Sequence, residues 1–95
     1  MTDGGPVNAD IARRLMALRT ALGLNLTAFS RRTGIPMNTL SNYESGLRRP
    51  ELDKAVMVVN ATGATLDWIY LGVRAGLPGH LLEKIAPFLG RQQAG

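Results

Sequence analysis

A short stretch at residues 37–42 carries the side chains best suited to recognising a ligand. Four of them follow the i, i+1, i+4, i+5 spacing that places residues on one side of a helix: Met37, Asn38, Ser41 and Asn42. A carboxamide can pair with N6 and N7 of adenine, and a methionine can pack on a thymine methyl group. A short helix presenting such groups fits the major groove of duplex DNA. We therefore expect these four residues to face base edges; an ordinary solvent-facing helix surface is the alternative.

Two short helices, at residues 25–33 and 36–45, are expected to position this stretch. Asn25 can cap the first helix, and Gly34 can make the turn because it lacks a Cβ atom. Pro36 can open the second helix, where its missing N–H costs nothing. Four apolar residues are spaced so that the two helices bury a small core between them: Phe29, Ile35, Leu40 and Tyr43.

Four further helices are expected, at residues 8–22, 51–62, 66–71 and 78–89, and no stretch requires a strand. The first has an apolar stripe at Ile11, Leu15, Leu18 and Leu22. The inner face of the helix after Pro50 is predicted to be Leu52, Ala55, Val56 and Val59. The sixth segment places Leu81, Leu82, Ile85, Phe88 and Leu89 on one side, with Pro87 late in it. The predicted organisation is a flexible N-terminus (1–7), one all-α unit (8–72), a helical extension (73–89) and a flexible tail (90–95).

The charge of the chain is unevenly distributed. Its 95 residues carry a net charge of +4 and no cysteine. Residues 11–50 hold seven arginines and one acidic residue, Glu44, whereas residues 51–95 hold four basic and four acidic residues. The positive half coincides with the two short helices, which indicates a polyanionic partner; a solvated basic face is the alternative. The N-terminus lacks the features of a secretory signal and no apolar run reaches ~20 residues, so we expect a cytoplasmic protein without a membrane contact.

These features together resemble the Cro/cI-type helix-turn-helix family, also called XRE, of phage and bacterial regulators. The resemblance covers residues 9–72 in one ungapped register. It rests on RRLMALRTALGL, Ser30, Gly34, Ile35, Leu40, YESG, Pro50 and LDWIYLG. It implies a five-helix, lambda-repressor-like domain, here with a short additional C-terminal helix. It also implies that the third helix enters the major groove of an operator.

The resemblance and the chemistry of the residues suggest further roles. Contacts to DNA phosphates are expected from Asn25, Thr39, Arg48 and Arg49, with Arg31 or Arg32 nearby. Similar family members pair the positions of Arg19 and Glu44 across the first and third helices. Such a pair would fix the angle of the reading helix and leave Arg19 donors for a phosphate; a purely structural pair is the alternative.

The chain departs from the family pattern in ways that keep a second function open. Leu26 stands where the second helix commonly opens with Gln, Pro36 removes a backbone donor, and Met37 replaces a more usual polar or basic residue. An antiactivator, which binds another regulatory protein through the same fold, is therefore the alternative to a DNA-binding regulator.

The C-terminal apolar residues also allow two interpretations. Either the sixth helix folds back on the domain, or it supplies a two-fold contact, since family members usually bind paired half-sites as dimers. We favour a homodimer, with a dimer or partner surface at Trp68, Leu81, Leu82, Ile85 and Phe88. No metal spacing, nucleophile motif or phosphate loop occurs, and His80 is the only histidine. We therefore expect no enzyme activity, no metal and no cofactor; a repressor acting on double-stranded DNA is the leading hypothesis.

Overall fold

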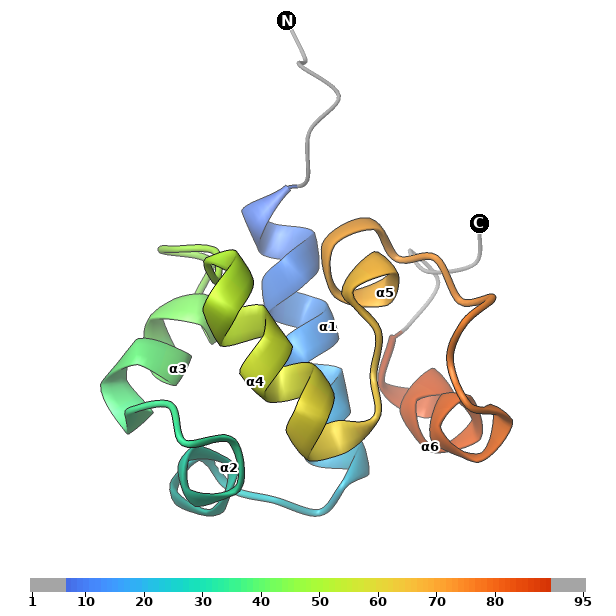
Figure 1. The fold of residues 1–95 in the computed structure, drawn as a ribbon, viewed down its shortest axis with the longest axis horizontal. Coiled ribbons are helices and arrows are strands. Elements are labelled where there is room, and N and C mark those ends of the chain that lie inside the picture. The colour runs from blue at the N-terminus through green and yellow to red at the C-terminus, as the bar shows by residue number, and fades with distance from the viewer. Residues whose placement is uncertain (1–6, 90–95) are drawn as a thin grey trace, which may run out of the picture.

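Residues 7–89, the part of the chain that the structure describes, form six helices and no strand in a computed structural model (Figure 1). The helices are α1 (Asn8–Ala21), α2 (Leu26–Thr33), α3 (Met37–Glu44), α4 (Leu52–Thr62), α5 (Leu66–Leu71) and α6 (Gly79–Leu89). The all-α prediction is confirmed. Most of the predicted flexible N-terminus and the whole predicted tail lie outside the described residues. Within residues 7–89, no helix combines the length and apolarity that crossing a membrane requires.

Helix α1 is the central element of the fold. It lies between α3 on one side and α6 on the other (Figure 1), and it packs against both. Its predicted stripe is buried at Ile11, Leu15 and Leu18, whereas Leu22 is half-buried just after the last helical residue. Helix α1 therefore holds α3, α5 and α6 in one domain.

The turn between α2 and α3 follows the prediction closely. The Oδ1 atom of Asn25 accepts a hydrogen bond from the backbone N–H of Ala28 at 2.8 Å, which caps α2. Gly34 has a φ of 82°, in the left-handed region that residues with a Cβ atom rarely adopt. Just after it, the Oγ atom of Ser30 donates to the carbonyl of Ile35 at 2.6 Å. The predicted core between the two helices is fully buried: Phe29, Ile35, Leu40 and Tyr43.

The predicted inner face of α4 needs correction. Leu52 is 63% exposed and Val56 is 37% exposed, whereas Ala55 and Val58 are buried. The error arises because residues 55–59 are all apolar, so the sequence gives no polar residues that mark which side of the helix faces solvent. Packing against α2 and α5 selects the face instead.

The predicted dimer or partner surface also needs correction, because α6 folds back on α1. Leu81 and Ile85 are buried together with Trp68 of α5 in the domain's own core. An amphipathic helix becomes more stable by burying its apolar stripe, and α1 lies within reach of the short α5–α6 connection. Of the predicted surface, only Leu82, which is half-buried, and Phe88, which is 48% exposed, remain accessible. The helix continues through Pro87 to Leu89.

Candidate nucleic-acid interface

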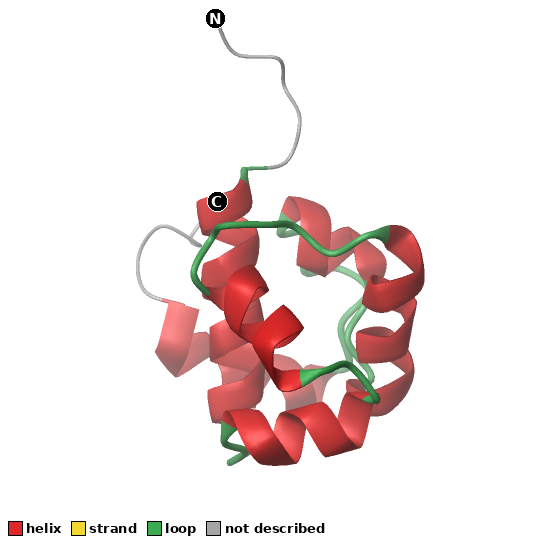
Figure 2. Cartoon of the chain, turned by 90° about the vertical axis from the view of Figure 1, so that its left-hand side faces the viewer, coloured by secondary structure: helices red, strands yellow, loops and turns green. Residues whose placement is uncertain are grey.

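Helix α3 presents its polar side to solvent. Figure 2 looks at this side of the molecule, with α3 in front and the other described helices beside or behind it. Leu40 and Tyr43 anchor the helix in the core. The four predicted base-reading residues lie on its opposite side: Met37, Asn38 and Ser41 are exposed, and Asn42 is half-buried. The structure therefore brings all four together on one accessible side of a short helix.

The first residue of α3 is held by α2. The Oγ1 atom of Thr27 donates a hydrogen bond to the Sδ atom of Met37 at 3.2 Å. Met37 nevertheless remains 47% exposed, so α2 holds this residue without covering it. Thr27 was not among the predicted site residues, since its role depends on the angle at which α2 and α3 meet.

A two-pronged ion pair connects α3 to α1. Arg19 donates from Nε to one Glu44 oxygen at 2.8 Å and from a terminal nitrogen to the other at 3.0 Å. Its second terminal nitrogen donates to the carbonyl of Leu24 at 3.0 Å. The side chains are 18% and 5% exposed for Arg19 and Glu44, respectively. A guanidinium has five N–H groups, so these three bonds leave two for an acceptor outside the domain.

The loop after α3 is hydrogen-bonded both to α3 and to the first residue of α1. The backbone N–H groups of Leu47 and Arg48 donate to the carbonyl of Asn42 at 3.1 Å and 3.2 Å. The Nε atom of Arg49 donates to Oδ1 of Asn8 at 2.8 Å, and Nδ2 of Asn8 donates to the carbonyl of Gly46 at 3.4 Å. Asn8 thus holds the Arg49 side chain beside the end of α3. The sequence did not identify Asn8, because no local pattern connects residues 41 positions apart.

Glu51, at the end of this loop, accepts hydrogen bonds from two residues. Glu51 accepts a hydrogen bond from the hydroxyl of Tyr43 at 3.2 Å and one from the guanidinium of Arg48 at 3.2 Å. Burial, reinforced by the nearby Glu51 carboxylate, raises the pKa of Tyr43 to about 12. A hydrogen bond from its own backbone N–H lowers the pKa of Glu51, and the Tyr43 hydroxyl acts in the same direction. Glu51 is therefore ionised at neutral pH and offsets part of the positive charge of Arg48.

Part of the predicted basic half does not belong to this interface. Arg14 is only 5% exposed and donates to the carbonyls of Ile69 and Tyr70 at 3.1 Å and 3.2 Å. Burial lowers the pKa of Arg14, although arginine remains charged at neutral pH. Its charge therefore stabilises the end of α5, whose last carbonyls lack helical partners. Arg13 pairs with Asp10 within α1.

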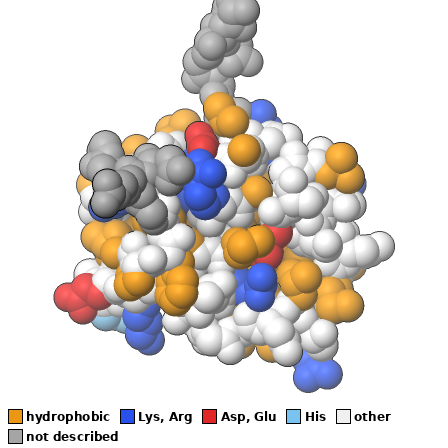
Figure 3. Space-filling view, turned by 180° about the vertical axis from the view of Figure 1, so that it is seen from behind, with side chains coloured by type: hydrophobic (Ala, Val, Ile, Leu, Met, Phe, Trp, Pro, Cys, Tyr) orange, Lys and Arg blue, Asp and Glu red, His pale blue; other side chains and the backbone are white. Residues whose placement is uncertain are grey.

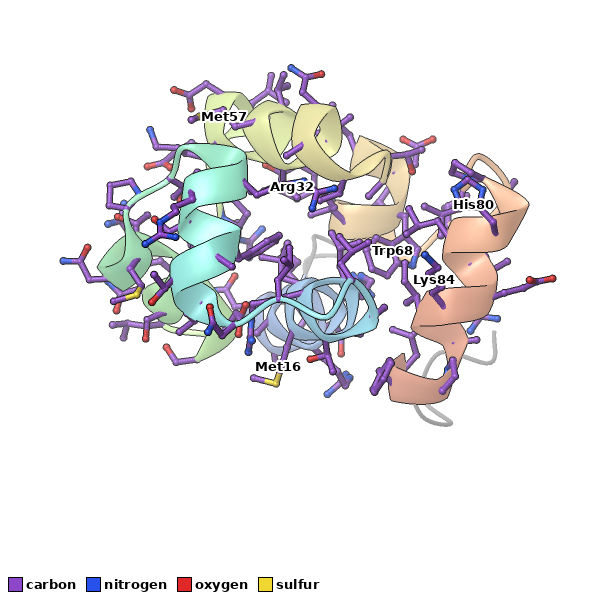
Figure 4. The ribbon with its side chains drawn as sticks, turned by 90° about the horizontal axis from the view of Figure 1, so that it is seen from below. Met16, Arg32, Met57, Trp68, His80 and Lys84 are labelled. Carbon is purple, nitrogen blue, oxygen red and sulfur yellow. The ribbon has the colours of Figure 1, made fainter. Side chains whose placement is uncertain are left out.

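The remaining predicted phosphate-binding residues lie around α2 and α3. Asn25 and Arg31 are exposed, and Thr39 is half-buried. Figure 4 shows Arg32 extending from α2 toward the side of α4 and α5 rather than toward α3. The preceding residue in a helix points about 100° away, so Arg31 does not share this direction and remains a candidate for the interface. On the face seen from behind the view of Figure 1, basic side chains are scattered among hydrophobic ones (Figure 3).

A short exposed helix that is anchored by a preceding helix and a tight turn defines a helix-turn-helix domain. The chain matches the helix-turn-helix family over residues 15–69, more than half of its length, and it belongs to the XRE branch of that family. A relative from Rhodospirillum rubrum, an uncharacterized transcriptional regulator in the ATPase CF(0) region, is 27% identical over 74 residues. The alignment covers 78% of this chain and 68% of the relative. No solved structure matches the chain.

Proposed function

We propose that this protein is a sequence-specific transcriptional regulator, which represses genes by binding an operator in double-stranded DNA through α3. The observation that carries the proposal is the exposed side of α3, which presents Met37, Asn38, Ser41 and Asn42 while the buried side anchors the helix. The name of the Rhodospirillum rubrum relative, a transcriptional regulator, is consistent with it.

The proposed contacts fall into two groups. Asn38 and Asn42 hydrogen-bond to base edges, and Met37 packs against a thymine methyl group. Arginines on the rim hold the phosphates and set the position of α3 without reading sequence. In this arrangement the Arg19–Glu44 pair fixes the angle of α3 and offers two N–H groups to a phosphate, in addition to Arg31, Arg48 and Arg49.

We further propose that two copies bind a pseudo-palindromic operator. Two half-sites would then be separated by one turn of DNA, roughly 34–36 Å. In this proposal the dimer contact does not use Trp68, Leu81 and Ile85, which are buried in the domain's own core. Repression would follow from occupation of a promoter, which excludes the polymerase.

The proposal is tested by selecting bound sequences from a random duplex pool and by titrating the selected duplex at several salt concentrations. An inverted repeat is expected, and log affinity should fall linearly with log salt, with a slope of about 0.9 per phosphate neutralised. A pool without enrichment, together with affinity that does not respond to salt, would contradict the proposal.

A second candidate is an antiactivator that binds another regulatory protein through the same surface. Exposed apolar residues at both ends of α3 favour it: Met37 is 47% exposed and Leu47 is 71% exposed. The buried C-terminal stripe removes part of the surface that this function would use. An empty duplex selection combined with a 1:1 complex with a purified regulator would favour this function.

A further inference from the structure

We infer that Met37 is an oxidation-sensitive position, at which conversion of the thioether to a sulfoxide by a hydroperoxide weakens DNA binding. The inference rests on the proposed function of α3. It assigns a chemical modification to one proposed base-reading residue. DNA affinity would then decrease when an oxidant is present.

Met37 is the one oxidisable side chain among the four proposed base-reading residues. The chain has no cysteine, so no thiol competes for a two-electron oxidant. Susceptibility of a methionine depends on access to its sulfur, and Met37 is 47% exposed. The half-buried Met57, by comparison, packs on the core, and its Cε atom would lie 3.3 Å from a Cβ atom added at Gly34. Met37 therefore combines access with a place in the interface.

The chain also provides an internal control. Met16 is 44% exposed, close to the value for Met37. It projects from α1 on the side opposite α4 (Figure 4), whereas Met37 begins α3. Oxidation at the two sites can therefore be compared at similar exposure, with only one of them in the proposed contact with bases.

The reaction balances with hydrogen peroxide as the oxidant. The sulfur attacks one peroxide oxygen, an S–O bond forms and the O–O bond breaks. The proton on the transferred oxygen moves to the departing oxygen, so that the products are a sulfoxide and water. Sulfur is oxidised and peroxide is reduced. The product is polar and chiral, whereas the thioether is apolar.

The contact with Thr27 increases the effect of Met37 oxidation on DNA binding. Its hydroxyl already donates to the Met37 sulfur at 3.2 Å, although a thioether is a weak acceptor. A sulfoxide oxygen, bonded to that sulfur, is a stronger acceptor for the same hydroxyl. The oxidised side chain is thereby held against α2, and a polar group replaces the methyl contact that Met37 makes with thymine. Loss of one good base contact corresponds to roughly a tenfold decrease in affinity.

The test uses the full chain and the duplex selected from the random pool. Affinity is measured before and after treatment with hydrogen peroxide, and sulfoxide at Met16, Met37 and Met57 is quantified by peptide mass spectrometry. Wild type and Met16→Leu should lose affinity roughly tenfold as Met37 sulfoxide accumulates. Met37→Leu keeps an apolar side chain without an oxidisable sulfur, and the affinity measured for it before treatment, whatever its value, should not change afterwards. Methionine sulfoxide reductases should restore the wild type.

Two results would overturn the inference: affinity that survives complete conversion of Met37, or an equal loss in Met37→Leu. Little oxidation at Met37 under conditions that oxidise Met16 would also overturn it. Failure of the proposed function is seen separately, as an absence of duplex binding before any peroxide is added.

Discussion

The Arg19–Glu44 pair gives the sharpest test of how the domain positions α3. The substitution Glu44→Gln keeps the shape of the side chain but removes its charge, and it faces an amide N–H₂ toward the Arg19 donors. The Glu44 side chain is only 5% exposed, so water cannot replace the lost acceptor. A charged hydrogen bond contributes about 1.5–3 kcal/mol, and breaking a buried pair costs more. Because Arg19 remains 18% exposed, we expect a loss of about 2 kcal/mol in the free energy of unfolding.

The assay is urea and thermal unfolding followed by circular dichroism. A loss of about 2 kcal/mol corresponds to a decrease of about 8–16 °C in Tm for a domain of this size. The matched control is Glu51→Gln, the same substitution in the exposed pair with Arg48, whose side chains are 54% and 56% exposed. That variant should lose much less than Glu44→Gln, since exposed pairs contribute little and the new amide oxygen can still accept from the Tyr43 hydroxyl. Equal effects of the two substitutions would refute the view that the buried pair holds α3 in place. For the DNA-binding proposal, Glu44→Gln should also weaken binding at temperatures where it is fully folded.

Three further outcomes are expected. Asn42→Ala should relax preference at one base pair of the selected duplex, whereas Arg49→Ala should weaken all duplexes alike and lower the salt slope by about 1; identical effects would contradict the division between base and phosphate contacts. Asn8→Ala should resemble Arg49→Ala in a milder form, because it removes the hydrogen bond that Asn8 accepts from Arg49; an unchanged affinity for random duplexes would rule out this positioning role. Since folding raises the pKa of Tyr43 from 10.0 to about 12, its contribution to stability is complete below pH 10 and lost as the pH rises to 12. Unfolding midpoints measured across that range should fall less steeply in Tyr43→Phe, and parallel curves would show that this hydroxyl is not responsible.

Features that depend on neighbouring residues could be predicted from the sequence. The α2 cap at Asn25, the left-handed turn at Gly34 and the burial of Phe29 and Tyr43 all appear in the structure. Each depends on a few consecutive residues or on the 3.6-residue period of a single helix. The resemblance to a known family added the Arg19–Glu44 pair, which no local pattern in this chain would have suggested.

Features that depend on how helices meet were decided only by the tertiary structure. The sequence counted Arg14 in the basic half of the chain and Trp68 in a dimer or partner surface, but packing places both inside the domain. Asn8 and Thr27 gain roles only because folding brings α1 beside the loop after α3, and α2 beside its first turn. A helix with several apolar residues can bury more than one face, and the neighbouring helices determine which face is buried. The sequence by itself therefore determined the helices and the residues that α3 presents, and the packing around α1 decided which charges and apolar residues remain available to a partner.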